Sequence, residues 1–265
     1  MKEQLMKHLA GHPWQANLHY YDSIDSTNTH AKRMAAQGAP HGTVLVARHQ
    51  TGGRGRLGRS FHSPEGSGVY LSVILRPDCM PGQLMHLTCA AAVAMCDAVE
   101  HSANLRPGIK WINDLVIGNQ KLGGILTELG LEPGSGRVSY AVIGIGINCA
   151  QQADDFPPEI RQIATSLNMA CGNPIDPMLL AAHMIRALHR MDAGIFIEKN
   201  TIMDAYRRNC VTLGKQVQLL QNGTVRPCTA MDIDDDGALI VVFQDGHRET
   251  VNSGEVSVRG MYGYV

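Results

Sequence analysis

Residues 50–60 read QTGGRGRLGRS, and this stretch decides between two fold classes. Gly53, Gly55 and Gly58 form a Gly-x-Gly-x-x-Gly pattern, which in a dinucleotide-binding fold stands directly before a helix. No helix is predicted here, because the next residues, SFHSPEGSG, have loop composition and a β-branched strand begins at Val69. We therefore reject a dinucleotide-binding fold and interpret the glycines as a ligand-binding loop between two strands.

The same loop is rich in arginine. Arg54, Arg56 and Arg59 lie within six residues, and the segment 26–64 contains six Lys or Arg and no acidic residue. Glycine lets the backbone approach a ligand and point N–H groups at it, and arginine binds phosphate or carboxylate through paired donors. The loop therefore predicts an anion-binding site, with a solvated basic loop as the alternative.

Strands and helices alternate around this loop, and the C-terminal part is entirely β. Short strands follow one another from Val211, separated by Asn-Gly and Asp-Gly turns, which is typical of a small barrel. We place a domain boundary between residues 1–211 and 212–265. Before it, we expect strands at 18–24, 43–49 and 69–75, helices at 26–37 and 81–101, three short strands with two hairpin turns between 109 and 147, and helices at 177–191 and 195–208.

Composition excludes several classes of protein. The 265 residues carry 23 basic and 24 acidic side chains, a net charge of −1, which argues against bulk nucleic acid or an anionic membrane as the main partner. Seven cysteines without a Cys-x-x-Cys pair favour neither a disulfide framework nor structural zinc. The longest apolar run, 89–96, is shorter than a bilayer span, and the N-terminus lacks the apolar core of a signal peptide. We expect a cytoplasmic protein.

Other candidate motifs in the sequence do not predict a functional site. Residues 232–237, DIDDDG, begin like a calcium-binding loop, but its twelfth position is Phe243 where a bidentate glutamate is required. An acidic hairpin turn is the prediction instead. The chain has no Walker A, HExxH or Gly-x-Ser-x-Gly motif, which disfavours P-loop ATPases, metallohydrolases and serine hydrolases.

Three more stretches have ordinary explanations when each is taken alone. Lys110 and Lys121 bracket a strand, a turn and a strand, and Ser26 is suited to cap a helix. Gly144 and Gly146 end a buried strand, where glycine either relieves crowding or lets a flat ligand lie on the sheet.

Together, these stretches resemble one family, the biotin protein ligases, also called biotin–[acetyl-CoA-carboxylase] ligases. The resemblance implies an α/β catalytic domain with a mixed β-sheet, related to the lipoate ligases, followed by a small SH3-like β-barrel. Five motifs match within residues 22–148 and in the family's order: Asp25-Ser26-Thr27-Asn28, QTGGRGRLGR at 50–59, Lys110-Trp111-x-Asn113-Asp114-Leu115, Lys121-Leu-Gly-Gly-Ile-Leu, and Gly144-x-Gly146-x-Asn148.

The resemblance implies a two-step reaction. Biotin's carboxylate attacks the α-phosphorus of ATP and forms biotinyl-5′-AMP and pyrophosphate. A lysine of the biotin carboxyl carrier protein of acetyl-CoA carboxylase then takes the biotinyl group, and AMP leaves. Mg²⁺ is expected to be carried by the ATP phosphates, without a metal ligand assigned to the protein.

The resemblance also implies residue roles. Lys121 and Arg54 are the expected catalytic cations. Biotin is expected to contact Ser26, Thr27, Asn28, Gln50, Gly53, Arg54, Gly55, Arg56, Lys121, Gly124, Gly144 and Gly146, and ATP is expected to contact Arg54, Arg56, Phe61, Asn113 and Asn148.

Two positions depart from the family pattern. Ile112 stands where the family commonly has proline, which predicts a looser turn around Asn113 because proline pre-sets φ. Phe61 stands where the family usually has a tryptophan that stacks on adenine. We expect weaker or retuned nucleotide binding with activity retained.

The N-terminal segment bears on whether the protein binds DNA. About 17 residues precede the first predicted strand, too few for the winged-helix domain of some family members, so we expect a monofunctional ligase that binds no DNA. The oligomeric state is left open between monomer and homodimer.

A lipoate or octanoate ligase is the nearest alternative, although the Arg-Gly-Arg loop and Lys-Leu-Gly-Gly-Ile-Leu favour biotin. A non-catalytic sensor is disfavoured by Arg54, Arg56 and Lys121, and a nucleic-acid-binding module by the seven acids against four bases after residue 211.

Overall fold

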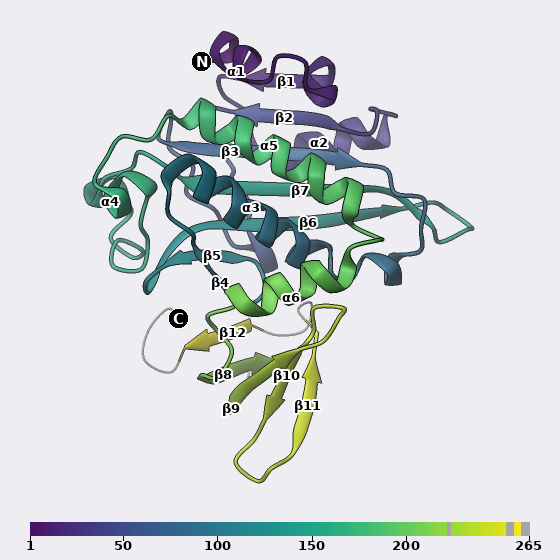
Figure 1. The fold of residues 1–265 in the computed structure, drawn as a ribbon, viewed down its shortest axis with the longest axis vertical. Helices are drawn as coiled ribbons and strands as arrows, with labels where there is room; N and C mark the ends of the chain where they lie inside the picture. The colour runs from purple at the N-terminus through teal and green to yellow at the C-terminus, as the bar shows by residue number, and fades with distance from the viewer. Residues whose placement is uncertain (222–223, 253–256, 261–265) are drawn as a thin grey trace.

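The computed structural model describes residues 1–221, 224–252 and 257–260, and their strands form two sheets (Figure 1). The larger sheet has seven strands in the order β1-β2-β3-β7-β6-β5-β4. β1 and β2 are parallel and the other neighbours are antiparallel, so the sheet is mixed, as expected. Its strands are β1 (Leu18–Tyr21), β2 (Thr43–Ala47), β3 (Gly68–Leu75), β4 (Gly108–Lys110), β5 (Asp114–Ile117), β6 (Gln120–Leu131) and β7 (Val138–Asn148).

Helices cover both faces of this sheet. In Figure 1, α3 and α5 lie in front of the sheet and α2 lies behind it. Strand residues alternate between the two sides, as the pleat requires: Val44 and Val46 join the core under α3 and α5, whereas Leu45 packs with Ala31 of α2. The helices are α1 (Lys2–His8), α2 (Thr27–Ala36), α3 (Leu87–Ala103), α4 (Leu167–Cys171), α5 (Pro177–Gly194) and α6 (Lys199–Asn209), with short 3₁₀ turns η1 (Pro13–Asn17), η2 (Arg56–Gly58), η3 (Pro81–Leu84) and η4 (Ala153–Asp155).

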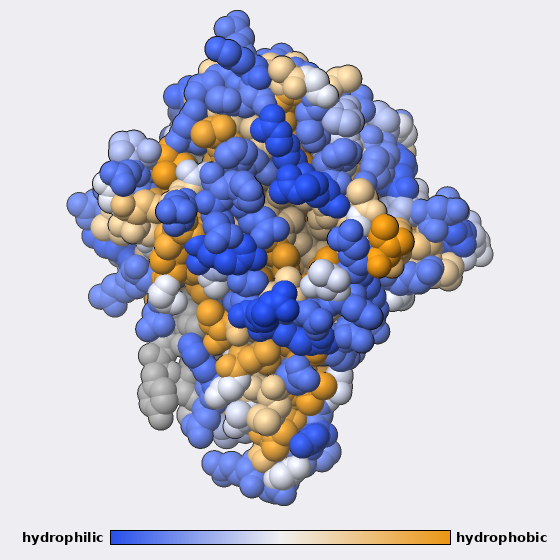
Figure 2. Space-filling model, in the orientation of Figure 1, coloured by the Kyte–Doolittle hydropathy of each residue, from blue (hydrophilic) through white to orange (hydrophobic). Residues whose placement is uncertain are grey.

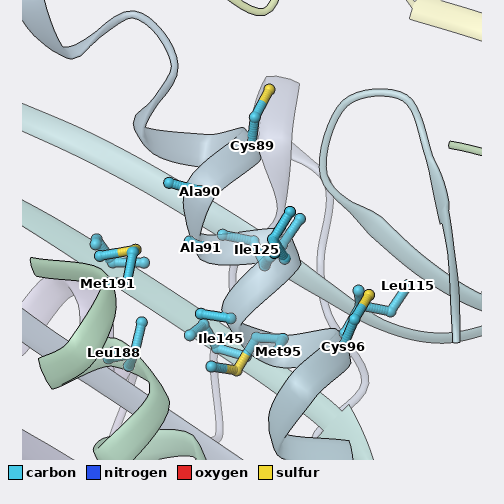
Figure 3. Close-up of a cluster of buried hydrophobic side chains, with 14 of the residues drawn as sticks. Cys89, Ala90, Ala91, Met95, Cys96, Leu115, Ile125, Ile145, Leu188 and Met191 are labelled. Carbon is cyan, nitrogen blue, oxygen red and sulfur yellow. The ribbon is translucent and has the colours of Figure 1, made fainter. Parts of the chain in front are cut away.

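The largest core lies between α3, α5 and the sheet. Figure 3 shows Met95 of α3 near Leu188 of α5 and Ile145 of the sheet, whereas Cys89 lies at the other end of the cluster. The segment Pro81–Ala103 is long and apolar enough, by length and composition alone, to cross a bilayer, which the run 89–96 did not indicate. However, 72% of its apolar window is buried inside the protein, as in a core helix that is apolar all round.

Between residues 108 and 148 the structure has one strand more than predicted. Both predicted hairpin turns are present, with positive φ at Gly118 and at Gly134. The additional strand arises because the segment 111–113 separates β4 from β5. β6 and β7 have 12 and 11 residues, so they are long rather than short.

The C-terminal strands form a five-stranded antiparallel sheet, which is the SH3-like unit that the resemblance implies. Its order is β11-β10-β9-β8-β12, so the described strands leave it open between β11 and β12. In Figure 2, hydrophobic residues gather over the lower part of the molecule, where this sheet lies, and hydrophilic residues cover much of the helical face above it. The predicted turn at 222–223 and residues 253–256 lie outside the described part of the chain. The strands are β8 (Gln216–Gln221), β9 (Thr224–Ile233), β10 (Leu239–Val242), β11 (Arg248–Val251) and β12 (Ser257–Gly260).

The acidic turn between β9 and β10 contacts α6 and the segment between β4 and β5. As predicted, the acidic stretch 232–237 contains a hairpin turn, and Asp234 Oδ1 accepts hydrogen bonds from the backbone N–H groups of Asp236 and Ala238. Lys199 of α6 binds Asp236 at 2.7 Å, and Arg207 of α6 binds Asp235 at 2.5 Å. The Gly237 carbonyl accepts a hydrogen bond from Trp111 Nε1 at 3.0 Å, so this turn also contacts the segment between β4 and β5.

Candidate active site

Most of the predicted site residues surround one cavity of about 470 Å³, a volume typical of small-molecule sites. Its walls come from the start of α2, the arginine-rich loop, β4 to β5, β6, β7 and one residue of the segment before α4. The lining residues that were predicted are Ser26, Thr27, Asn28, Gln50, Arg54, Gly55, Arg56, Phe61, Asn113, Lys121, Gly124, Gly144 and Gly146.

Gly53 and Asn148 do not line the cavity. Gly53 is buried, and a Cβ there would lie 2.4 Å from the Phe61 carbonyl oxygen, so glycine permits the two arms of the loop to approach each other. Asn148 is also buried; its Nδ2 donates to the Thr165 carbonyl at 3.0 Å and its Oδ1 accepts from Gln151 at 3.2 Å. Both residues therefore shape the surroundings, and their ligand contacts stay predictions.

Gln50 connects the first turn of α2 to the arginine-rich loop. Ser26 caps α2, as its sequence position indicated, by accepting from the Thr29 N–H. Gln50 Oε1 accepts from the Thr27 backbone N–H at 2.8 Å and from its hydroxyl at 3.1 Å, and Gln50 Nε2 donates to Ser63 Oγ at 3.0 Å. Loop and helix therefore share one hydrogen-bond network beside the cavity.

Asn28 packs against Gly144 of β7. Its Oδ1 accepts from the buried Ser72 hydroxyl at 2.8 Å, and its Nδ2 lies 3.3 Å from the Leu126 carbonyl oxygen. A Cβ on Gly144 would lie 1.9 Å from Asn28 Oδ1, so Gly144 makes room for this side chain. Of the two explanations for this glycine, the structure favours relief of crowding.

The ring of Phe61 occupies the equivalent place over Gly146, where a Cβ would lie 2.5 Å from its Cε1. The ring also meets Tyr70 edge-on, with centroids 6.4 Å apart. Phe61 therefore lies at the cavity wall, where stacking on a nucleobase stays a prediction.

The turn with Ile112 is held on both sides. Ile112 is buried, and its carbonyl accepts from the Tyr206 hydroxyl at 3.0 Å. Asn113 Nδ2 donates to the Ile125 carbonyl at 3.0 Å, and Asn113 Oδ1 accepts from Arg56 Nη1 at 2.8 Å. The looser turn that we expected from isoleucine in place of proline stays a prediction. Its effect on nucleotide binding stays a prediction.

The cavity carries an excess of positive charge. Arg54, Arg56, Arg59, Lys110 and Lys121 line it, and the one carboxylate among its lining residues is that of Asp114. Lys121 Nζ donates to Asp114 Oδ1 at 2.7 Å. Burial lowers the pKa of the Arg56 guanidinium, yet arginine remains charged in proteins. Such a cavity attracts an anionic ligand.

Several residues that line the cavity had no predicted role. Asp114 and Lys110 lay inside a quoted motif without an assigned role. Ser72 could have been noticed as a polar residue within the apolar strand GVYLSVIL. Ile163 lines the cavity because its segment pairs with β6: Lys121 N–H donates to the Ile163 carbonyl at 2.7 Å. No pattern in the local sequence predicts that pairing.

The described residues contain no group of three or more His, Cys, Asp or Glu side chains placed to hold a metal ion.

Comparisons with known proteins identify the family. Residues 20–148 match the Biotin/lipoate A/B protein ligase family, and residues 212–259 match the Biotin protein ligase C terminal domain. The chain is 40% identical over 235 residues to the bifunctional ligase/repressor BirA of Bacillus spizizenii, a match covering 87% of this chain and 70% of that protein. The chain belongs to the biotin protein ligase family.

Other members agree with this assignment. The chain is 33% identical over 265 residues to the biotin–[acetyl-CoA-carboxylase] ligase of Mycobacterium tuberculosis, covering 97% of this chain and 93% of that one. Its fold matches the biotin protein ligase from Aquifex aeolicus in complex with biotin and ATP, with a TM-score of 0.75, 27% identity and coverage of 92% and 99% of the two chains. The resemblance predicted from five motifs is confirmed, and as a family member the chain is a ligase.

Proposed function

We propose that this biotin protein ligase family member activates biotin with ATP to biotinyl-5′-AMP and transfers the biotinyl group to a lysine of the biotin carboxyl carrier protein of acetyl-CoA carboxylase. The observation that carries the proposal is the convergence of Arg54, Arg56 and Lys121 with the first turn of α2 on one cavity. The related Aquifex ligase was solved with biotin and ATP, which supports these two ligands.

Charge compensation is the main catalytic need. A carboxylate must approach a triphosphate, and negative charge grows on the phosphoryl oxygens during transfer, so fixed cations and backbone donors lower the barrier. Arg54 and Arg56 bind the biotin carboxylate and the adenylate phosphate. Lys121 reaches the reacting oxygens from β6, and Asp114 orients its ammonium at 2.7 Å.

Biotin binding uses the start of α2 and the adjacent strand ends. Asn28, Gly144 and Gly146 shape the floor on which the ligand rests, and Phe61 and Asn113 face the nucleotide with Asn148 behind them. The proposed biotin contacts are Ser26, Thr27, Asn28, Gln50, Gly53, Arg54, Gly55, Arg56, Lys121, Gly124, Gly144 and Gly146.

Mg²⁺ would be held mainly by the phosphates of ATP. Magnesium in such sites typically takes one or two carboxylates in addition to phosphate oxygens, and Asp114 is the one carboxylate among the lining residues. The chemistry that the ion would supply is neutralisation of the charge on the leaving pyrophosphate.

The test is ATP–pyrophosphate exchange with purified protein and biotin, lipoate or octanoate as the added acid. Exchange that requires biotin is the expected result. Exchange only with lipoate or octanoate would move the substrate while keeping the fold and the chemistry. Biotin binding without exchange would favour the sensor alternative. Transfer is then tested by mass spectrometry of a biotin carboxyl carrier domain after incubation with biotin and ATP.

We further propose two domains, residues 1–211 and 212–265, in a cytoplasmic ligase that binds no DNA and is a monomer or homodimer. The two separate sheets support the boundary. Sedimentation at micromolar concentration distinguishes the oligomeric states, and a gel-shift titration with duplex DNA tests the absence of binding.

A further inference from the structure

Glu128 of β6 connects the arginine-rich loop to α2. Its Oε2 accepts from Asn28 Nδ2 at 2.9 Å and from Arg54 Nη1 at 3.3 Å, and its Oε1 accepts from Lys32 Nζ at 2.8 Å. The Glu128 side chain is 18% exposed, whereas that of Arg54 is 44% exposed. One largely buried carboxylate therefore holds a residue from each of two elements that line the cavity.

This carboxylate supplies a charge that the segment 26–64 lacks. That segment has six basic residues and no acid, so its cations depend on partners from elsewhere in the chain. Arg33 forms an ion pair with Asp25, and Arg48 forms one with Glu65. Both pairs are exposed to solvent. Arg54 has Glu128, which is the one ion-pair partner that the described residues give it.

Glu128 is ionised at neutral pH. Burial raises the pKa of its carboxyl, but hydrogen bonds from Lys32 and Asn28 and the charge of Arg54 outweigh burial and hold the pKa below its ordinary value. Because Lys32 already offsets the negative charge at 2.8 Å, Glu128 can orient Arg54 with little repulsion of an incoming anion.

We propose that Glu128 is a positioning residue for the ligase reaction, which fixes the Arg54 guanidinium beside Asn28 before biotin binds. This inference rests on the proposed function. Arg54 meets Glu128 through Nη1 at one end of its planar fork, so its remaining donors are left for the substrate carboxylate. Without Glu128, the ligand would have to order an exposed arginine on a glycine-rich loop. The conformational entropy lost in ordering it would weaken ligand binding.

The discriminating variant is Glu128→Gln. The amide keeps one acceptor oxygen in the place of Oε2, which Asn28 and Arg54 share, but it loses the charge that attracts Arg54 and puts an NH2 group where Oε1 accepted from Lys32. We expect the Kd for biotin, measured by calorimetry, to rise about tenfold, as for the loss of one charge-assisted contact. The matched control is Arg33→Gln on α2, the helix of Lys32. It removes the exposed ion pair with Asp25 and should leave the Kd within twofold of wild type.

A double-mutant cycle separates positioning from general loosening of the fold. If Glu128 acts through Arg54, then Glu128→Gln should weaken biotin binding by less than twofold in the Arg54→Ala background. Equal losses in both backgrounds, or an unchanged Kd in Glu128→Gln, would overturn the proposal. Thermal denaturation of each variant establishes that the compared proteins are folded.

The two proposals fail in different ways. Wild type that binds biotin but shows no exchange refutes the ligase function, while the cycle in Kd still decides the role of Glu128. Wild type that exchanges with biotin, with no coupling between Glu128 and Arg54, refutes the positioning role alone. Wild type that does not bind biotin refutes both.

Discussion

Lys121 Nζ lies 2.7 Å from Asp114 Oδ1, an ion pair that bridges β5 and β6 at the wall of the cavity. The two side chains are 29% and 18% exposed, so the pair is partly shielded from water. The ammonium is therefore held in place at the cavity wall. This arrangement suits a cation that must meet developing negative charge without reorganising.

We predict that Lys121→Ala and Arg54→Ala each fold normally and lose most adenylation, by at least about 100-fold, because each removes a fixed cation from the reacting oxygens. The measurement is biotin-dependent ATP–pyrophosphate exchange, with circular dichroism and thermal denaturation as checks of folding. Lys215→Ala removes an exposed lysine of the C-terminal part and serves as the control. Wild-type exchange rates in both cavity variants would refute their assignment.

A second prediction concerns the floor of the cavity. Gly144→Ala places a methyl group 1.9 Å from Asn28 Oδ1, so Asn28 must leave its bonds to Ser72 and Glu128. We expect a loss of about 1–3 kcal/mol in the free energy of unfolding, as for overpacked cores, together with weakened biotin binding. Urea denaturation and calorimetry measure the two effects.

The control for this variant is Gly82→Ala. A Cβ at Gly82 meets no atom within 4 Å, and the residue does not have positive φ. This substitution should change neither stability nor biotin binding noticeably. If Gly144→Ala behaved like Gly82→Ala, Asn28 would have to be mobile, and the proposed role of the glycine would fall.

The predicted features that depend on neighbouring residues agree with the structure. Ser26 caps α2, the turns at Gly118 and Gly134 are present, and the loop between β2 and β3 does not open a helix of the dinucleotide-binding kind. In each case the deciding interaction spans a few residues, so the local sequence contains the information.

The features that were missed depend on contacts between distant segments. Glu128 meets Lys32 from 96 positions away, and Ser72 meets Asn28 from 44. Ile163 reaches the cavity through pairing with Lys121. A single sequence carries no local pattern for such contacts, whereas the resemblance supplied those site residues that lie inside motifs.

The cysteines give a prediction independent of function. All seven are free, and six are buried. Burial raises the pKa of Cys149 to about 12 and that of Cys228 to about 11, which suppresses the reactive thiolate. A thiol reagent at pH 7.5 should react slowly with the native protein and should titrate seven thiols after denaturation without reductant. Fewer than seven in the denatured protein would indicate a disulfide.

The last prediction follows from His86, which is buried where α3 begins. Its Nε2 lies 2.9 Å from the Ile195 carbonyl oxygen, while its Nδ1 is buried without a hydrogen-bond partner in the described structure. Burial, assisted by the charge of Lys199, lowers the pKa of His86 below 6.5, against the Ile195 hydrogen bond and Asp236. The unfolded chain therefore binds this proton more readily than the folded protein, so the contribution of His86 to stability must fall as the pH drops below 6.5. His86→Gln keeps a donor for Ile195 and has no titrating group, so its free energy of unfolding should fall less steeply than that of wild type between pH 7 and 5.

Above pH 7.5 the difference between the two proteins should be constant, which provides an internal control. Urea denaturation across this pH range makes the measurement, and parallel curves down to pH 5 would show that His86 does not carry the acid sensitivity.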